Sequence, residues 1–113
     1  MTYRTINIKQ DMPTTDYAIH LMLEEIKLAK FTGEKVIVVI HGYGSHGVGG
    51  LIKQEVHKTL VELKRRGQIT NFVTGEQWQS DTALCRQILS YNPDIEIAHD
   101  LHLHNIGVTV ILV

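Results

Sequence analysis

The chain has 113 residues, of which 43% are hydrophobic and 20% charged, and its formal charge at pH 7 is -1. The length fits one domain, and the balance is that of a globular protein, which excludes a disordered chain. A charge of -1 supplies no overall basic field, so any binding to a polyanion requires a local basic patch. The longest unbroken apolar run, 36–40, is far too short to span a membrane.

The first half of the chain predicts strand, helix, strand, helix and strand, in that order. Residues 3–8 alternate in polarity as a half-buried strand does, and helical periodicity with cap residues follows over about 14–31. Residues 36–40 are β-branched throughout, which is typical of a strand buried on both faces. A glycine-rich turn leads into a second amphipathic helix that ends at Gly67, and 69–73 predict the third strand.

The second half is less regular. A short helix capped at 80–81 is expected inside the segment 76–104, and 108–113 predict a last apolar strand. We therefore expect one α/β domain over residues 1–113: a two-layer β-α-β-α-β core with a mixed or parallel sheet and an extra helix inserted before the last strand. The second face of the sheet is covered either by this third helix or by a dimer partner.

The single cysteine, Cys85, excludes an internal disulfide and fits a reducing compartment, so we expect a cytoplasmic protein. We interpret Cys85 as a small buried hydrophobe.

The most distinctive segment is the glycine-rich turn between the buried strand and the second helix, in which five of ten residues are glycine. Glycine lets a ligand approach the main chain, and the free N–H groups at the start of a helix favour an anion. The sequence therefore predicts a phosphate-binding turn, and the alternative is a flexible loop without a ligand. The predicted contact residues are His41, Gly42, Tyr43, Gly44, Ser45, His46, Gly47, Gly49 and Gly50, together with Lys53 on the helix.

Two well-known phosphate motifs do not explain this turn. Gly42, Gly44 and Gly47 match the spacing of the dinucleotide fingerprint, but they follow the second strand, and the chain has no room for a two-half Rossmann fold. No Gly-Lys-Ser/Thr follows the glycines, which excludes a P-loop.

Three motifs together resemble the Smr, or small MutS-related, domain family. Residues 41–44 match the family's His-Gly-x-Gly at the end of a strand. Ile52 and Lys53 stand where the following helix opens with Leu-Arg, and Val56 matches the valine after them. Residues 107–112 resemble the closing strand, Gly-x-Thr-x-x-x-Leu. The resemblance covers 3–75 and 105–113 and leaves 76–104 as an insertion.

This resemblance implies binding to nucleic acid, DNA or RNA, with endonuclease or nicking activity in several members. The family's first strand ends in Leu-Asp-x-His-Gly, where this chain has Asn7 and Lys9 in place of the acid and the imidazole. Neither replaces the lost group as metal ligand or base near pH 7. We therefore expect binding with cleavage lost or weak, His41 as the one catalytic candidate, no cofactor, and a divalent metal only if cleavage is retained.

The histidines have alternative interpretations. His41 is either an acid-base group or a residue that holds the turn by hydrogen bonds, and His46 is either a phosphate contact or simply exposed. His57 is expected on a solvated face of the helix. The string 99–104 is interpreted as a surface strand with its histidines outward, and no metal site is predicted there.

Two other functions stay open. In the first, the chain is a protein-interaction or dimerisation module, and the segment 76–104 with Trp78 forms the partner surface. In the second, the chain binds a small phosphate or nucleotide. The basic run 64–66 lies about 20 Å along the helix from the glycine-rich turn, so it cannot bind the same phosphate. It is either a solvated face of the helix or an extension of the surface that follows a nucleic-acid backbone.

Overall fold

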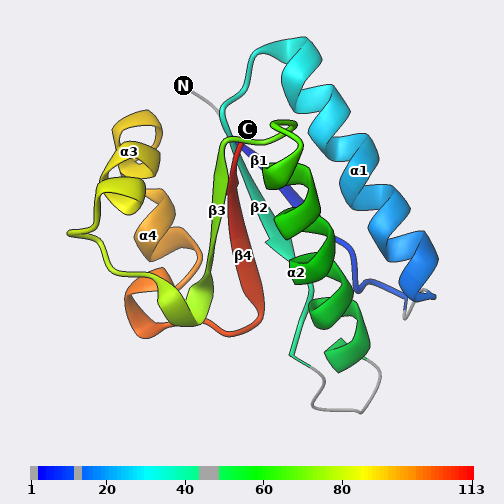
Figure 1. The fold of residues 1–113 in the computed structure, drawn as a ribbon. Helices are drawn as coiled ribbons and strands as arrows, with labels where there is room; N and C mark the ends of the chain where they lie inside the picture. Colours follow the sequence, from blue (N-terminus) through cyan, green and yellow to red (C-terminus); the bar gives the residue numbers. More distant parts are fainter. Residues whose placement is uncertain (1–2, 12–13, 44–48) are drawn as a thin grey trace.

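The structure is a computed structural model that describes residues 3–11, 14–43 and 49–113. At its centre is a four-stranded sheet in the order β1-β2-β4-β3 (Figure 1). The strands are β1 (Arg4–Asn7), β2 (Val36–Ile40), β3 (Asn71–Thr74) and β4 (Val108–Leu112). β1 is parallel to β2, whereas β4 is antiparallel to both β2 and β3. The expected α/β class with a mixed sheet is therefore confirmed.

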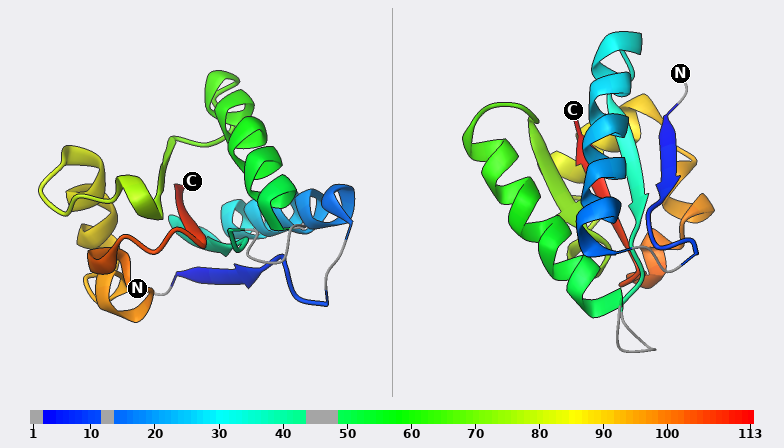
Figure 2. Two further views of the ribbon diagram at one scale, coloured as in Figure 1. Left: turned by 90° about the horizontal axis from the view of Figure 1, so that it is seen from below. Right: turned by 90° about the vertical axis from the view of Figure 1, so that its right-hand side faces the viewer.

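Two long helices, α1 (Thr15–Thr32) and α2 (Gly49–Arg65), cover one face of the sheet (Figure 2). α1 starts where the sequence predicts, because the Thr14 side chain accepts a hydrogen bond from the Tyr17 N–H at 3.2 Å. Both helices bury residues at helical spacing against alternate residues of β2, which is why the β-branched run forms a core strand. This core includes Met22, Ile26, Ile37, Val39, Ile52, Val56, Leu60 and Ile111.

The segment between β3 and β4 covers the other face. It contains η1 (Gly75–Gln77), α3 (Ala83–Tyr91), α4 (Ile95–Ala98) and η2 (Leu101–Leu103). A second core there joins these elements to the remaining residues of the strands. It includes Val36, Val38, Trp78, Cys85, Ile88, Ile95, Leu101 and Val110. The chain thus covers both sheet faces by itself, and the third helix, rather than a dimer partner, belongs to the second layer.

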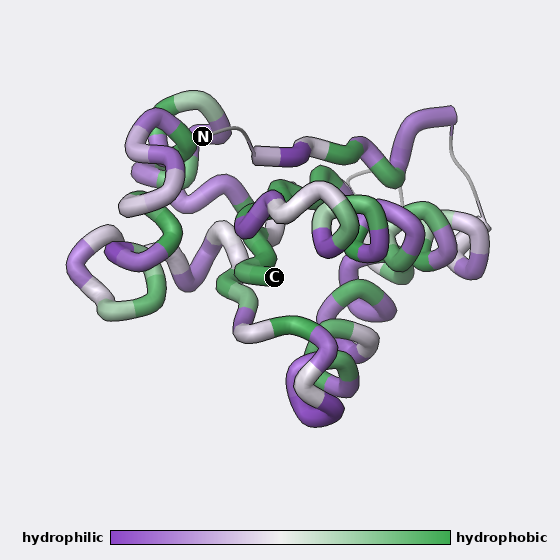
Figure 3. Tube along the Cα trace, turned by 90° about the horizontal axis from the view of Figure 1, so that it is seen from above, coloured by the Kyte–Doolittle hydropathy of each residue, from purple (hydrophilic) through white to green (hydrophobic). Residues whose placement is uncertain are grey.

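The hydropathy of the chain follows this layering. Hydrophobic residues run along the central strands, and hydrophilic residues alternate with them around the helices (Figure 3). Cys85 is buried, as expected. Within the described ranges no helix has the length and apolar character needed to cross a membrane.

The histidine string near residue 100 does not form the expected strand. Residues 101–103 form a turn of 3-10 helix, with Leu101 buried in the second core and His102 exposed. Asp100 and His104 flank it with left-handed φ angles of 55° and 56°. The alternation of polarity in this string favours a strand, but a short helical turn can also carry it. The prediction was wrong because the packing of Leu101 into the second core selects the helical turn, and the local pattern does not show that packing.

Candidate functional site

The glycine-rich turn begins where β2 ends, and its first residues are fixed to the strand beside it. The N–H groups of His41 and Gly42 both donate to the carbonyl of Gly107, each at 3.0 Å. Gly42 has a φ of 72°, which favours glycine, and a Cβ atom there would lie 2.9 Å from the Cδ of Lys9. The side chain of Lys9 therefore lies directly against the turn.

Part of the predicted contact set lies outside the described residues. Gly44, Ser45, His46 and Gly47 belong to the undescribed segment. Gly49 and Gly50, which the sequence places at the end of the turn, form the first residues of α2.

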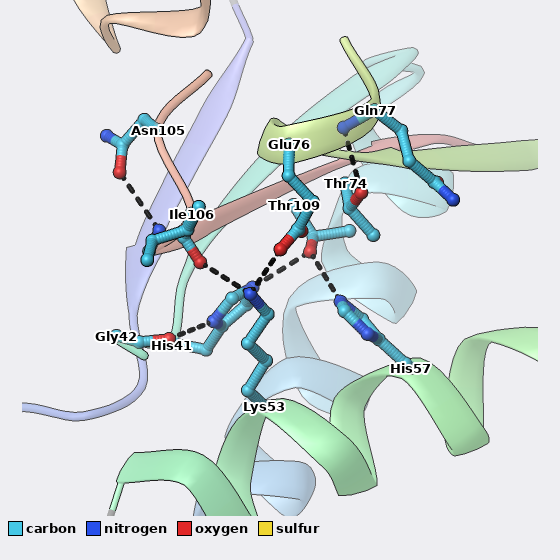
Figure 4. A network of polar contacts seen from close by, with 11 residues as sticks. His41, Gly42, Lys53, His57, Thr74, Glu76, Gln77, Asn105, Ile106 and Thr109 are labelled. Carbon is cyan, nitrogen blue, oxygen red and sulfur yellow. Dashed lines mark hydrogen bonds and ion pairs between the residues drawn. The ribbon is translucent and has the colours of Figure 1, made fainter. Parts of the chain in front are cut away.

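His41 is completely buried, and both of its ring nitrogens have partners (Figure 4). Nδ1 lies 2.6 Å from the carbonyl oxygen of Gly42, and Nε2 lies 2.8 Å from the hydroxyl of Thr109 on β4. Burial lowers the pKa of His41 to about 4, although the hydrogen bond to Gly42 works in the opposite direction. The imidazole is therefore neutral at pH 7. Its placement favours the interpretation that His41 holds the turn.

These contacts fix the direction of each hydrogen bond. The Gly42 carbonyl can only accept, so Nδ1 of His41 carries the proton, and Nε2 of the neutral ring must accept. The Thr109 hydroxyl therefore donates to His41. Its oxygen is then left to accept from His57 Nε2, which lies 3.2 Å away. One hydroxyl thus joins two imidazoles in a single directed chain.

The expectation that His57 lies on a solvated face is wrong. Its ring lies edge-on to His41 at 5.7 Å between centroids and stacks on Phe72 at 6.5 Å. Burial lowers its pKa, and the nearby Lys53 cation lowers it further. The sequence does hold a signal for this position. His57 lies four residues after Lys53, and residues four apart share one face of a helix, so His57 lies on the same face as the predicted contact residue Lys53.

Lys53 is bound from two directions. Its Nζ donates to Glu76 Oε2 at 2.6 Å and to the Ile106 carbonyl at 2.9 Å. Partial burial works to raise the pKa of Glu76, but hydrogen bonds from Lys53 and Thr74 outweigh it and lower that pKa. Glu76 was not among the predicted site residues, because it belongs to the segment 76–104, for which no contact with the glycine-rich turn was expected.

The elements around Lys53 are locked together by a close backbone approach. A Cβ atom at Gly75 would lie 1.7 Å from the carbonyl oxygen of Asn105, so only glycine fits there. The Asn105 side chain accepts from the Gly107 N–H at 3.0 Å and donates to the His99 carbonyl at 3.0 Å. Residues 41–43 at the start of the turn, η1 and the chain before β4 thus form one rigid edge.

The surface of this edge carries apolar and basic side chains. Tyr43 is 55% exposed, Leu51 58% and Ile106 43%. Tyr43 lies beside Gly107, since its Cδ1 is 3.6 Å from the position of a Cβ there. Among the described residues none forms an ion pair with the ammonium group of Lys9. An aromatic ring and an unpaired cation therefore face solvent together.

The end of β1 supplies no acid. The side-chain oxygen of Asn7 accepts from the Lys9 N–H at 3.1 Å, so the amide stabilises the turn after the strand. In the part of the chain that the structure describes, no three His, Cys, Asp or Glu side chains gather as metal ligands would.

Trp78 does not form a partner surface. It is 1% exposed, and its indole N–H donates to Glu96 at 2.7 Å. This part of the interaction-module interpretation is wrong, because the indole completes the second core of the domain itself.

Comparisons with protein-family models, with curated proteins and with solved structures found no match.

Proposed function

We propose that the chain binds the backbone of nucleic acid at the rigid edge formed by Lys9, Gly42, Tyr43 and Lys53, and that it does not cleave it. The observation that carries this proposal is the placement of Lys9 against Gly42, beside an exposed tyrosine. Lysine positions phosphates, and an aromatic face stacks on bases of any sequence. The resemblance of residues 41–44 to the His-Gly-x-Gly motif of Smr domains supports the same function.

Lys53 can exchange its partner for a phosphate at low cost. Its ion pair with Glu76 is partly exposed: the Glu76 side chain is 40% exposed and the Lys53 side chain 18%. Solvent that reaches the Glu76 carboxylate screens the pair and weakens it. A nucleic-acid phosphate replaces one anionic oxygen by another, while the Ile106 carbonyl keeps the ammonium group in position.

Cleavage is not expected, because the acid and the histidine that end the first strand in the Smr pattern are both replaced here and His41 is fully bonded. Asn7 replaces the acid of the Smr pattern, and Lys9 replaces its histidine. The buried imidazole of His41 is neutral, and both of its nitrogens are bonded. A general base must reach the proton that it removes. The proposed site therefore holds a phosphate but does not remove the proton of an attacking water or hydroxyl group.

The test is a fluorescence-anisotropy titration of labelled single- and double-stranded RNA and DNA at roughly 50 and 200 mM salt. Lys53→Gln should weaken binding several-fold and reduce the slope of log affinity against log salt by about 1. Lys27→Gln on α1 removes the same charge from an exposed position and should change little.

A second variant separates phosphate binding from a general loss of charge. Glu76→Gln removes the carboxylate that competes for Lys53, so affinity should rise about two- to fivefold, the effect of less than 1 kcal/mol. Equal affinities of Lys53→Gln, Glu76→Gln and the parent would contradict the proposal. Nicking of nucleic acid by the parent, lost in His41→Ala, would contradict the absence of cleavage.

A further inference from the structure

A groove of about 440 Å³ lies between α2 and the edge strand β3, at the opposite end of α2 from the glycine-rich turn. Its volume is in the range of pockets that take small molecules. The groove is lined by Val61, Lys64, Arg65, Asn71, Phe72 and Gln77.

The walls combine apolar surface with hydrogen-bonding groups. Phe72 lines the groove with a half-buried aromatic ring that stacks on His57 on one side, and Val61, which is 59% exposed, adds apolar surface. The Asn71 side-chain oxygen accepts from the Phe72 N–H at 2.8 Å, so its amide group is fixed at the sheet edge. The exposed side chain of Gln77 supplies a second amide at the rim. A flat ring with polar edges fits such a set of walls.

The rim of the groove is positively charged. Arg65 and Arg66 share a single carboxylate, Glu62, with the shortest contact at 2.5 Å. Lys64 has no ion-pair partner within the described ranges. Three cations for one anion leave a net charge that complements a phosphate group.

The groove lies toward the same side of α2 as the first site. Lys53, His57 and Val61 follow one another at intervals of four residues, and Lys64 lies about three full turns after Lys53. His57 stacks on Phe72, which lines the groove. Eleven residues separate Lys53 from Lys64, a rise of about 16 Å along the helix. An extended strand of a few nucleotides spans this distance.

We infer that the groove binds one unpaired nucleobase on Phe72, with its phosphate on Lys64 and Arg65, as a second subsite of the same single strand. This inference rests on the proposed function and adds its preferred ligand, which is single-stranded nucleic acid long enough to reach both sites. A paired base has no free face for Phe72, so a duplex binds at the first site alone. RNA and DNA share this chemistry.

The experiment titrates the folded chain with labelled oligouridylate and oligothymidylate of about 12 and about 4 nucleotides, and with a duplex of the longer length. Phe72→Leu removes the aromatic ring and should weaken binding of the long strands about fivefold or more. The short strand and the duplex should change little. A preference for one of the two long strands identifies RNA or DNA as the ligand.

The double variant Lys64→Gln/Arg65→Gln tests the phosphate contact at exposed positions that do not contribute to the core. It should reduce the salt slope for the long strands by about 1 to 2. Lys27→Gln/Lys30→Gln on α1 removes the same charge and is the matched control. The double variant also decides the matter if Phe72→Leu fails to fold, since Phe72 packs partly against the first core.

The outcomes separate the two proposals. If the parent binds no strand at roughly 50 mM salt, both are overturned. If Lys53→Gln weakens binding while both groove variants bind the long strands as the parent does, only the groove is overturned.

Discussion

At the scale of single residues, the hydrogen-bond chain from His57 through Thr109 to His41 depends on a neutral imidazole at His41. Protonation of His41 would make both of its nitrogens donors, and the Thr109 hydroxyl would then face a donor in place of an acceptor. His41 Nδ1 also donates to the Gly42 carbonyl, so the protonation state of His41 affects the turn that carries the first site.

We predict that the domain loses stability in acid through His41. Its pKa is about 4 when folded, against an ordinary value of 6.5, so the unfolded chain binds more protons between these values. The free energy of unfolding should therefore fall as the pH decreases, by about 2 kcal/mol between pH 7 and pH 5 from this residue alone. His57 and His99, whose pKa values burial also lowers, act in the same direction.

Urea unfolding at the two pH values measures this effect. His41→Gln retains an amide for hydrogen bonding but does not titrate, so its stability should depend less on pH by about the same amount. An identical pH dependence in the variant and the parent would show that another group is responsible.

At the scale of elements, the regular parts of the chain were predictable and the connections were not. The β-branched run 36–40 and the capped helix after Thr14 follow from local preferences that the fold confirms. The contact of Lys53 with Glu76 joins residues 23 positions apart, and it depends on how η1 follows β3. The turn at 101–103 depends on where Leu101 packs. Neither is encoded by local pattern, because each is decided by long-range packing.

The contact between η1 and the chain before β4 gives a prediction at this scale. Gly75→Ala should destabilise the domain by about 3 kcal/mol or more, because the added methyl would overlap the Asn105 carbonyl and the backbone must shift. Gly50→Ala in α2 is the matched control. A Cβ at Gly50 meets nothing within 4 Å, and alanine favours helix by about 0.5–1 kcal/mol. Chemical denaturation of the two variants measures both effects, and equal stabilities would contradict the close approach.

At the scale of the whole molecule, the formal charge of -1 means that only local cations attract a polyanion. Lys9 and Lys53 form the first site, and Lys64 and Arg65 line the groove. Apart from these four cations the chain has 7 Lys and Arg residues against 12 Asp and Glu residues, so the rest of the chain adds no general attraction for a polyanion.

The salt dependence of binding should therefore be shallow. Two to four phosphate contacts on a single strand give a slope of about -1.5 to -3 for log affinity against log salt. Titrations at several salt concentrations measure it. A slope steeper than about -5 would require more phosphate contacts than these four cations supply, and would locate binding on a different or larger surface.

The order of the strands in the sheet also could not be predicted from the sequence. Position along the chain suggests that β3 pairs with its predecessor β2, but β4 lies between them and pairs with both. The class of fold could be predicted from the alternation of strands and helices, whereas the neighbours of each strand depend on long-range packing that local patterns do not encode.

The central place of β4 has a consequence for the way the protein is made. A ribosome releases β1, α1, β2, α2 and β3 first, and during that time β3 has no strand to join and β2 has one open edge. Both cores lack one of their two central strands until residues 108–112 are made, so the nascent chain exposes apolar surface up to that point. The domain is therefore expected to fold only after β4 has been made, and chaperones that hold newly made chains can bind the exposed surface before then.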